Sequence, residues 1–117
     1  MATFQIYNFP DHIKGDTFNG VEFTLEVNSL PVDLTNASIK MYLKTQSKAC
    51  DVVAKFTTDN GKLTITDAVN GVFQFDNQII NINAGTYDYD IEITLNNGTI
   101  KTYIKGTWKI LQDITNG

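Results

Sequence analysis

The stretch TYDYDIEITLNNGTIKTYIKGTWKIL, residues 86–111, decides the fold class. Apolar and polar side chains alternate on both sides of Asn97-Gly98, and this period of two is typical of half-buried β-strands. Asn-Gly pairs favour the type I′ turn that joins the two strands of a hairpin. A two-residue loop at this point places apolar residues opposite one another: Leu95 and Ile100, Ile91 and Ile104, Tyr87 and Trp108.

The same register places polar and charged side chains on the opposite face of the hairpin, where Asp90 meets Lys105 and Glu92 meets Tyr103. A slip by one residue would bring the aliphatic side chains opposite the lysines, so the pattern specifies the pairing strongly. We therefore predict two facing rows of core residues: Ile91, Ile93 and Leu95 on one strand, and Ile104, Thr102 and Ile100 on the other.

Alternation with a period of two recurs along the rest of the chain. It predicts further strands over 21–27, 39–44, 52–57, 62–66 and 72–76. Asn-Gly pairs separate several of these apolar runs, and no helical pattern of comparable length is present. The longest stretch without strand character, 28–37, contains Pro31 and is predicted to cross between two sheets. Together these features predict an all-β, immunoglobulin-like antiparallel β-sandwich that forms a single domain over residues 1–117.

One local pattern is more specific than the alternation. The heptapeptide NAGTYDY, residues 83–89, resembles the tyrosine corner at the start of strand F in immunoglobulin-like domains. The tyrosine hydroxyl of that motif bonds to preceding backbone, so we expect Tyr87 to be buried and bonded within 79–85. Trp108 is expected in the core between the sheets. The Cys-Trp-Cys pattern of antibody domains is missing, so membership of the antibody family is not supported.

Composition excludes several classes of function. The length of 117 residues fits one domain, and 42% hydrophobic with 19% charged residues is typical of a globular protein. A formal net charge of −4 argues against wrapping a nucleic-acid backbone, which requires a basic surface. No apolar run is long enough for a transmembrane helix, and the N-terminal residues lack the pattern of a signal peptide. We expect neither nucleic acid nor membrane as a partner.

The residues best suited to chemistry occur singly. His12, the only histidine, lies in the polar segment 10–14, and we expect a surface or loop role. Cys50, the only cysteine, cannot form an internal disulfide; Lys48 could lower its pKa, but no histidine is near it in sequence. A partly buried, unreactive thiol in a loop is the favoured interpretation. We predict no catalytic, cofactor-binding or metal-binding residue and no cofactor.

Asp88, Asp90 and Glu92 form a row of carboxylates along one strand face. Clustered carboxylates can bind calcium, and two well-placed ones can serve a glycosidase. The predicted hairpin instead brings lysines beside them, and cross-strand pairs of opposite charge explain the row without an ion. The lysines concerned are Lys101, Lys105 and Lys109. We favour the charge pairs over both alternatives.

Tyr42, Tyr103 and Phe56 are predicted on outward faces. Exposed aromatic rings on a sheet can stack on sugars or insert into a protein partner. Cover by the second sheet or by long loops explains the same positions without a ligand. The sequence leaves both interpretations open.

Short motifs in a fixed order extend over 15–115. They are GDTF at 15–18, PVDLTNASIKM at 31–41, ITDA at 65–68, GVF at 71–73, AGTYDYDI at 84–91, GTWKI at 106–110 and DIT at 113–115. Their order and spacing resemble small phage and prophage structural proteins with immunoglobulin-like folds, and are similar to the N-terminal module of upper baseplate proteins. The sequence departs from this pattern at Asn36, where the relatives often have glycine, and it lacks their longer C-terminal extension.

The resemblance implies a non-enzymatic structural or docking component of a phage or prophage tail-like particle, baseplate or tail associated. Such a protein is made in the bacterial cytoplasm and incorporated into the particle, where it contacts other particle proteins or its own copies. The family implies no catalytic residues. The alternative is a carbohydrate-binding or adhesin-like module, with a hydrolase as a distant third possibility. A sugar binder should present a concave face with at least two solvent-exposed aromatic rings, whereas a particle component should present a large flat or edge interface and no pocket.

Overall fold

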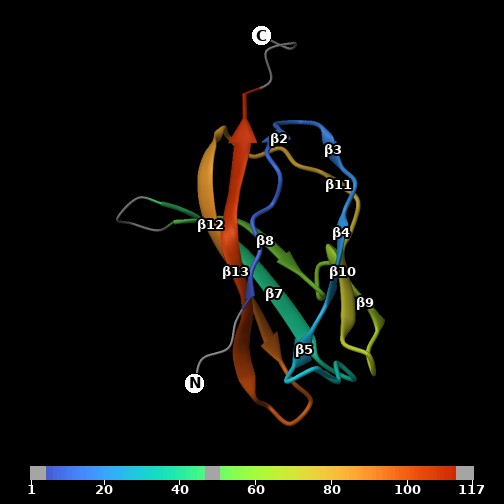
Figure 1. The fold of residues 1–117 in the computed structure, drawn as a ribbon. Coiled ribbons are helices and arrows are strands. Elements are labelled where there is room, and N and C mark those ends of the chain that lie inside the picture. Colours follow the sequence, from blue (N-terminus) through green and yellow to red (C-terminus); the bar gives the residue numbers. More distant parts are fainter. Residues whose placement is uncertain (1–4, 47–50, 113–117) are drawn as a thin grey trace.

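The computed structural model describes residues 5–46 and 51–112, which form two β-sheets packed face to face (Figure 1). The large sheet has the strand order β1-β13-β12-β7-β8, and β2 also pairs with β13. Its strands are β1 (Gln5–Ile6), β2 (His12–Ile13), β7 (Ser38–Thr45), β8 (Val52–Thr57), β12 (Gly85–Thr94) and β13 (Ile100–Leu111).

The small sheet has the order β4-β10-β9, and two short pairs, β3 with β11 and β5 with β6, flank it in the chain. The strands of the small sheet and of these pairs are β3 (Thr17–Phe18), β4 (Val21–Thr24), β5 (Glu26–Val27), β6 (Leu30–Pro31), β9 (Leu63–Asp67), β10 (Val72–Phe75) and β11 (Gln78–Ile79). The pairs are antiparallel, except that β1 and β2 run parallel to β13. This is an immunoglobulin-like β-sandwich, as the sequence predicts.

The strands predicted outside the hairpin form with small shifts at their ends, except that 21–27 is divided at Leu25 into β4 and β5. The prediction for 28–37 is wrong at its start, because Leu30 and Pro31 form β6 and pair back onto β5. Asn28 and Ser29 join these two strands with φ values of 54° and 66°. Two successive left-handed residues are what a type I′ hairpin turn requires, and asparagine tolerates that conformation. Only the remainder of the segment crosses to the large sheet.

The core between the sheets consists of aliphatic and aromatic side chains. Those at most 1% exposed are Leu34, Ile39, Met41, Leu43, Phe73, Phe75, Ile80, Ile91, Ile93, Trp108 and Ile110. Trp108 is 0% exposed and stacks on Phe9, with ring centroids 4.5 Å apart. Its indole N–H donates a hydrogen bond to the Pro10 carbonyl at 3.0 Å. The predicted core position of Trp108 is confirmed.

The hairpin register is confirmed over half its length. Tyr87 pairs with Trp108, Asp90 with Lys105 and Ile91 with Ile104. Beyond Ile91 the register shifts by one residue, so Glu92 lies opposite Thr102 and Ile93 opposite Lys101. The predicted pairs of Glu92 with Tyr103, of Ile93 with Thr102 and of Leu95 with Ile100 are therefore wrong, and Ile100 is 62% exposed.

The cause of the shift is the length of the turn. The Leu95 N–H donates to the Thr99 carbonyl at 2.8 Å, which leaves three residues in the loop rather than two. Gly98 takes a φ of 89° as the last of them, the usual geometry of a three-residue hairpin loop. An irregularity between Ile91 and Glu92 absorbs the difference, with Tyr103 as the extra residue on β13.

The tyrosine corner is present. Tyr87 is buried, and its hydroxyl donates a hydrogen bond to the Asn83 carbonyl at 2.5 Å, within the predicted segment. Gly85 lies against this ring, with φ at 156°. The bond ties the start of β12 to the loop that arrives from the small sheet.

Replacing Tyr87 with phenylalanine is expected to lower the free energy of unfolding by about 0.5–1.5 kcal/mol, because the hydrogen bond from its hydroxyl to the Asn83 carbonyl is lost. Urea denaturation measures the loss. Tyr42→Phe is the matched control, because that ring is only half buried, and we expect it within about 0.5 kcal/mol of the wild type. A neutral Tyr87→Phe variant would exclude a stabilising role for the corner.

Candidate interaction surfaces

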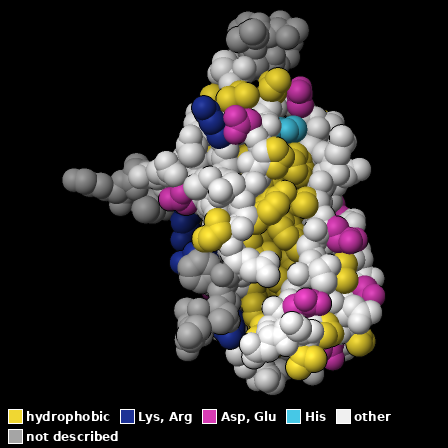
Figure 2. Space-filling model, viewed as in Figure 1, with side chains coloured by type: hydrophobic (Ala, Val, Ile, Leu, Met, Phe, Trp, Pro, Cys, Tyr) yellow, Lys and Arg dark blue, Asp and Glu magenta, His cyan; other side chains and the backbone are white. Residues whose placement is uncertain are grey.

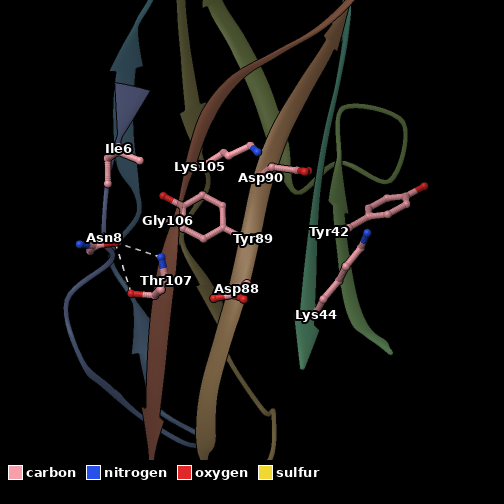
Figure 3. Close-up of a pocket in the computed structure, with 10 residues that line it drawn as sticks. All are labelled: Ile6, Asn8, Tyr42, Lys44, Asp88, Tyr89, Asp90, Lys105, Gly106 and Thr107. Atoms are coloured by element: carbon pink, nitrogen blue, oxygen red, sulfur yellow. Dashed lines mark hydrogen bonds between the residues drawn. The ribbon is translucent and has the colours of Figure 1, made fainter. Parts of the chain in front are cut away.

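A shallow groove of about 400 Å³ lies on the outer face of the large sheet (Figure 3). Its lining comes from strands β7, β12 and β13 and from residues 5–10, which we call the N-terminal segment. The residues are Ile6, Asn8, Tyr42, Lys44, Asp88, Tyr89, Asp90, Lys105, Gly106 and Thr107. Figure 3 shows Tyr42 and Lys44 on one side and Ile6 and Asn8 on the other, with the two aspartates between them.

The charges in the groove alternate in sign from strand to strand. Asp90 lies opposite Lys105 on β13, and Asp88 lies opposite Lys44 on β7. A carboxylate oxygen of Asp88 also accepts a hydrogen bond from the Gln46 side chain at 2.7 Å. Cross-strand neighbours of opposite charge stabilise a sheet face, so this arrangement accounts for the acidic row structurally.

No group of three or more His, Cys, Asp and Glu side chains that could hold a metal ion occurs in 5–46 and 51–112. The carboxylates singled out in the sequence lie on one strand, and each has a cross-strand lysine or threonine neighbour. Within the same residues, no helix is long and apolar enough to cross a membrane.

His12 lies in β2 opposite Ile110 rather than in a loop, and its half-exposed side chain lies at the surface, the other role expected of it. Its ring meets Phe18 edge to face at 5.4 Å, and Nε2 donates to the Asp16 carbonyl at 2.9 Å. These contacts give the ring a structural role at the end of the sandwich. Cys50 lies outside the described residues.

Two of the three aromatic residues predicted on outward faces are buried. Phe56 is 4% exposed because it pairs with Met41 and shares its inward face. Tyr103 is 7% exposed because the irregularity in β13 turns it inward, with the Lys101 ammonium 5.7 Å from the ring. Tyr42 alone remains half exposed, beneath the Lys55 ammonium at 5.2 Å.

The N-terminal segment is a part of the site that sequence analysis missed. The N–H groups of Tyr7 and Phe9 donate to the carbonyls of Lys105 and Thr107, at 2.9 and 3.0 Å. The Tyr7 carbonyl points across β13 at Gly106 and accepts a hydrogen bond from the Tyr89 hydroxyl. Burial, together with the nearby Tyr7 hydroxyl, raises the pKa of Tyr89, so this hydroxyl stays protonated and donates. The alternation of aromatic and polar side chains at Tyr7, Asn8 and Phe9 is the sequence feature that could have indicated a strand here.

Strand β8 forms one edge of the large sheet, and outward backbone groups near its C-terminal end are capped. Pairing with β7 turns the N–H and C=O groups of Lys55 and Thr57 away from the sheet. Asn60 then folds back onto them: its amide oxygen accepts from the Thr57 N–H and its amide nitrogen donates to the Lys55 carbonyl, both at 3.0 Å. The Lys62 N–H donates to the Thr57 carbonyl at 3.2 Å. The C-terminal end of this edge is therefore protected against pairing with another chain.

Strand β9, at one edge of the small sheet, is irregular. Its register on β10 shifts between Val72 and Phe73, which leaves Thr66 as an extra residue. A bulge of this kind twists an edge strand and interrupts regular pairing.

Strand β4, at the other edge of the small sheet, is regular and open. Phe23 pairs with Phe73, and the Leu25 N–H donates to the Gly71 carbonyl at 2.9 Å. Because hydrogen-bonded pairs alternate along an antiparallel ladder, the backbone groups of Glu22, Thr24 and Glu26 point away from β10. None of these three residues has a backbone partner on its outward side among the described residues.

An apolar stripe runs along the open side of the sandwich, between the N-terminal segment and β4 (Figure 2, compare Figure 1). Tyr7 and Val21 are partly buried there and pack against the core. The Tyr7 ring meets Phe23 edge to face at 5.3 Å. The open edge of β4 is thus bordered by apolar surface.

No protein-family model matches this chain, and the curated proteins give no match. Among solved structures it is similar to CopC from Methylosinus trichosporium OB3b, with 11% identity over 87% of this chain and 84% of that chain, at a TM-score of 0.46. It is also similar to extracellular domains 3–5 of Drosophila OTK, with 15% identity over 96% of this chain and 34% of that chain, at a TM-score of 0.39. At these values the comparisons carry no argument about function.

Proposed function

We propose that this chain is a non-enzymatic structural or docking component of a phage or prophage tail-like particle, baseplate or tail associated, that acts through protein–protein contacts. The observation that carries the proposal is the open edge of β4, since an unpaired strand can be completed by another chain. The order of the sequence motifs over 15–115 supports the setting in a particle.

The motifs behind the resemblance have architectural roles in this fold. GDTF supplies β3 and the buried Phe18. In the DLTNA stretch, the Thr35 N–H and hydroxyl donate to one carboxylate oxygen of Asp33, at 2.9 and 2.6 Å. Asn36 takes a φ of 59°, a conformation that glycine adopts readily, which fits its place where relatives often have glycine. The shared motifs therefore concern turns and core, and they support a common scaffold rather than common chemistry.

The test is the mass of the protein in solution, measured by light scattering alone and with the products of adjacent genes. We expect a defined complex with one of these products or a symmetric oligomer, since repeated copies turn a weak interface into avidity. We also expect no turnover on glycan, peptide or ester substrates. A strict monomer without a protein partner would overturn the proposal.

A carbohydrate-binding module is the alternative, and the groove on the large sheet is the observation that favours it. Its lining combines the half-exposed Tyr42 with side chains that form hydrogen bonds, such as Asp88 and Thr107. A glycan array run beside the scattering experiment separates the two functions. A clear sugar ligand that Tyr42→Ala abolishes, found together with a strict monomer, would establish the alternative.

A further inference from the structure

We infer that the open edge of β4 and β5 is the docking site, and that its partner is an extended segment of another protein in which basic residues four positions apart alternate with apolar ones. This inference rests on the proposed docking function and specifies its surface and partner. Backbone geometry, apolar surface and charge each contribute one part of the argument.

The edge is continuous over residues 21–27. The Leu25 carbonyl accepts from the Val32 N–H at 3.0 Å, on the same side of the strand as the bond from Leu25 to Gly71. The β5–β6 hairpin therefore continues on the side of β10 and leaves the opposite side free. The outward groups of Glu22, Thr24 and Glu26 recur every second residue, which is the spacing that an added strand requires.

The apolar stripe explains why the partner needs apolar side chains. Side chains of a strand alternate between the two faces of its sheet, so a segment paired with β4 directs every second residue toward the core side. On that side lie Val21, Phe23 and the Tyr7 ring. Apolar residues of the added strand would cover this surface and remove it from water.

Charge explains why the partner is basic rather than a second copy. Glu22 and Glu26 are exposed on the outer face of the small sheet, four residues apart. The chain has nine lysines and arginines, and none lies in 15–39 or 63–100, which contain all the strands of the small sheet. Two copies paired at this edge would bring acidic sheets together, and like charges across strands are destabilising. Lysine or arginine opposite the two glutamates stabilises the pairing instead.

The experiment uses the full chain and a fluorescent, end-blocked peptide of nine residues, in which two lysines four positions apart alternate with valine and isoleucine. A second peptide carries glutamate in place of both lysines. Fluorescence anisotropy measures binding, and amide NMR shifts locate it. We expect the lysine peptide to bind at least about tenfold more tightly than the glutamate peptide. The largest amide NMR shifts are expected at Glu22, Thr24 and Glu26.

Three variants test the site. Thr24→Pro removes an outward N–H without disturbing the pairs between β4 and β10, since proline is tolerated on an edge strand, and should weaken binding at least about tenfold. Lys55→Pro, the matched change on the capped edge of β8, should leave binding unchanged. The double variant Glu22→Lys and Glu26→Lys should reverse the preference between the two peptides, which a merely misfolded protein could not do.

Each outcome has a meaning. Binding of neither peptide, or binding that Thr24→Pro does not weaken, overturns the inference. A homodimer that Thr24→Pro dissociates assigns the edge to a second copy and overturns the basic partner. If the peptides fail while the chain still assembles with products of adjacent genes, the docking function stands and uses another surface.

Discussion

Replacing Trp108 with alanine is expected to lower the free energy of unfolding by about 3–5 kcal/mol, a large share of the ~5–15 kcal/mol typical of a domain. The side chain is fully buried and its ring contacts Phe9, Phe18 and Phe75. Truncation leaves a cavity where strands of both sheets and the N-terminal segment meet. It also leaves the Pro10 carbonyl without its donor.

Urea denaturation followed by far-UV circular dichroism measures this loss, because the variant lacks the only tryptophan of the chain. Trp108→Phe is the informative control: it keeps an aromatic ring in the core and removes the indole N–H, so its loss should be clearly smaller. A loss below about 1 kcal/mol for Trp108→Ala would contradict the observed burial.

Gly106→Ala is expected to cost about 2–4 kcal/mol, although a single methyl group is added. A Cβ at this position would lie 1.8 Å from the Tyr7 carbonyl oxygen and 2.7 Å from its carbon. Both contacts are with backbone, so a side-chain rotation cannot relieve them. The N-terminal segment must move away from β13, and the Tyr89 hydroxyl then loses its acceptor.

Equilibrium unfolding in urea again gives the magnitude, and Lys109→Ala, an exposed change on the same strand, should remain within about 0.5 kcal/mol of the wild type. The double variant with Tyr89→Phe tests the mechanism. Because both changes act on the Tyr7 carbonyl, their costs should be less than additive. Full additivity would show that the two residues act independently.

Much of the fold follows from local pattern. Alternation identifies the long strands, and the corner motif at Tyr87 fixes the start of β12, because both depend on neighbouring residues. The turn after Leu95 does not follow in the same way, since a glycine that follows asparagine can also end a three-residue loop. The loop length decides which side chains of β13 face inward, and so Tyr103 and Ile100 were assigned to the wrong faces.

The candidate interface was less accessible to sequence reasoning. Openness of the β4 edge depends on where the β5–β6 hairpin lies, and protection of the β8 edge depends on Asn60 folding back over Thr57. Neither arrangement produces a periodic pattern of apolar and polar residues from which it could be predicted. The sequence shows that 15–39 contains no lysine. That this makes one sheet acidic follows only from the structure, in which strands far apart in the chain share that sheet.

The position of β13 has a consequence for the order of folding. It is the last strand of the described chain, yet it lies between β12 and the first strands, β1 and β2. During synthesis the N-terminal segment therefore has no partner until residues 104–111 emerge, and Phe9 lacks the indole on which it stacks. Bringing β1 and β2 onto residues 104–111 closes a long loop, and proteins dominated by such distant contacts fold in milliseconds to seconds. The ribosome must release residues 5–111 before the large sheet can be completed.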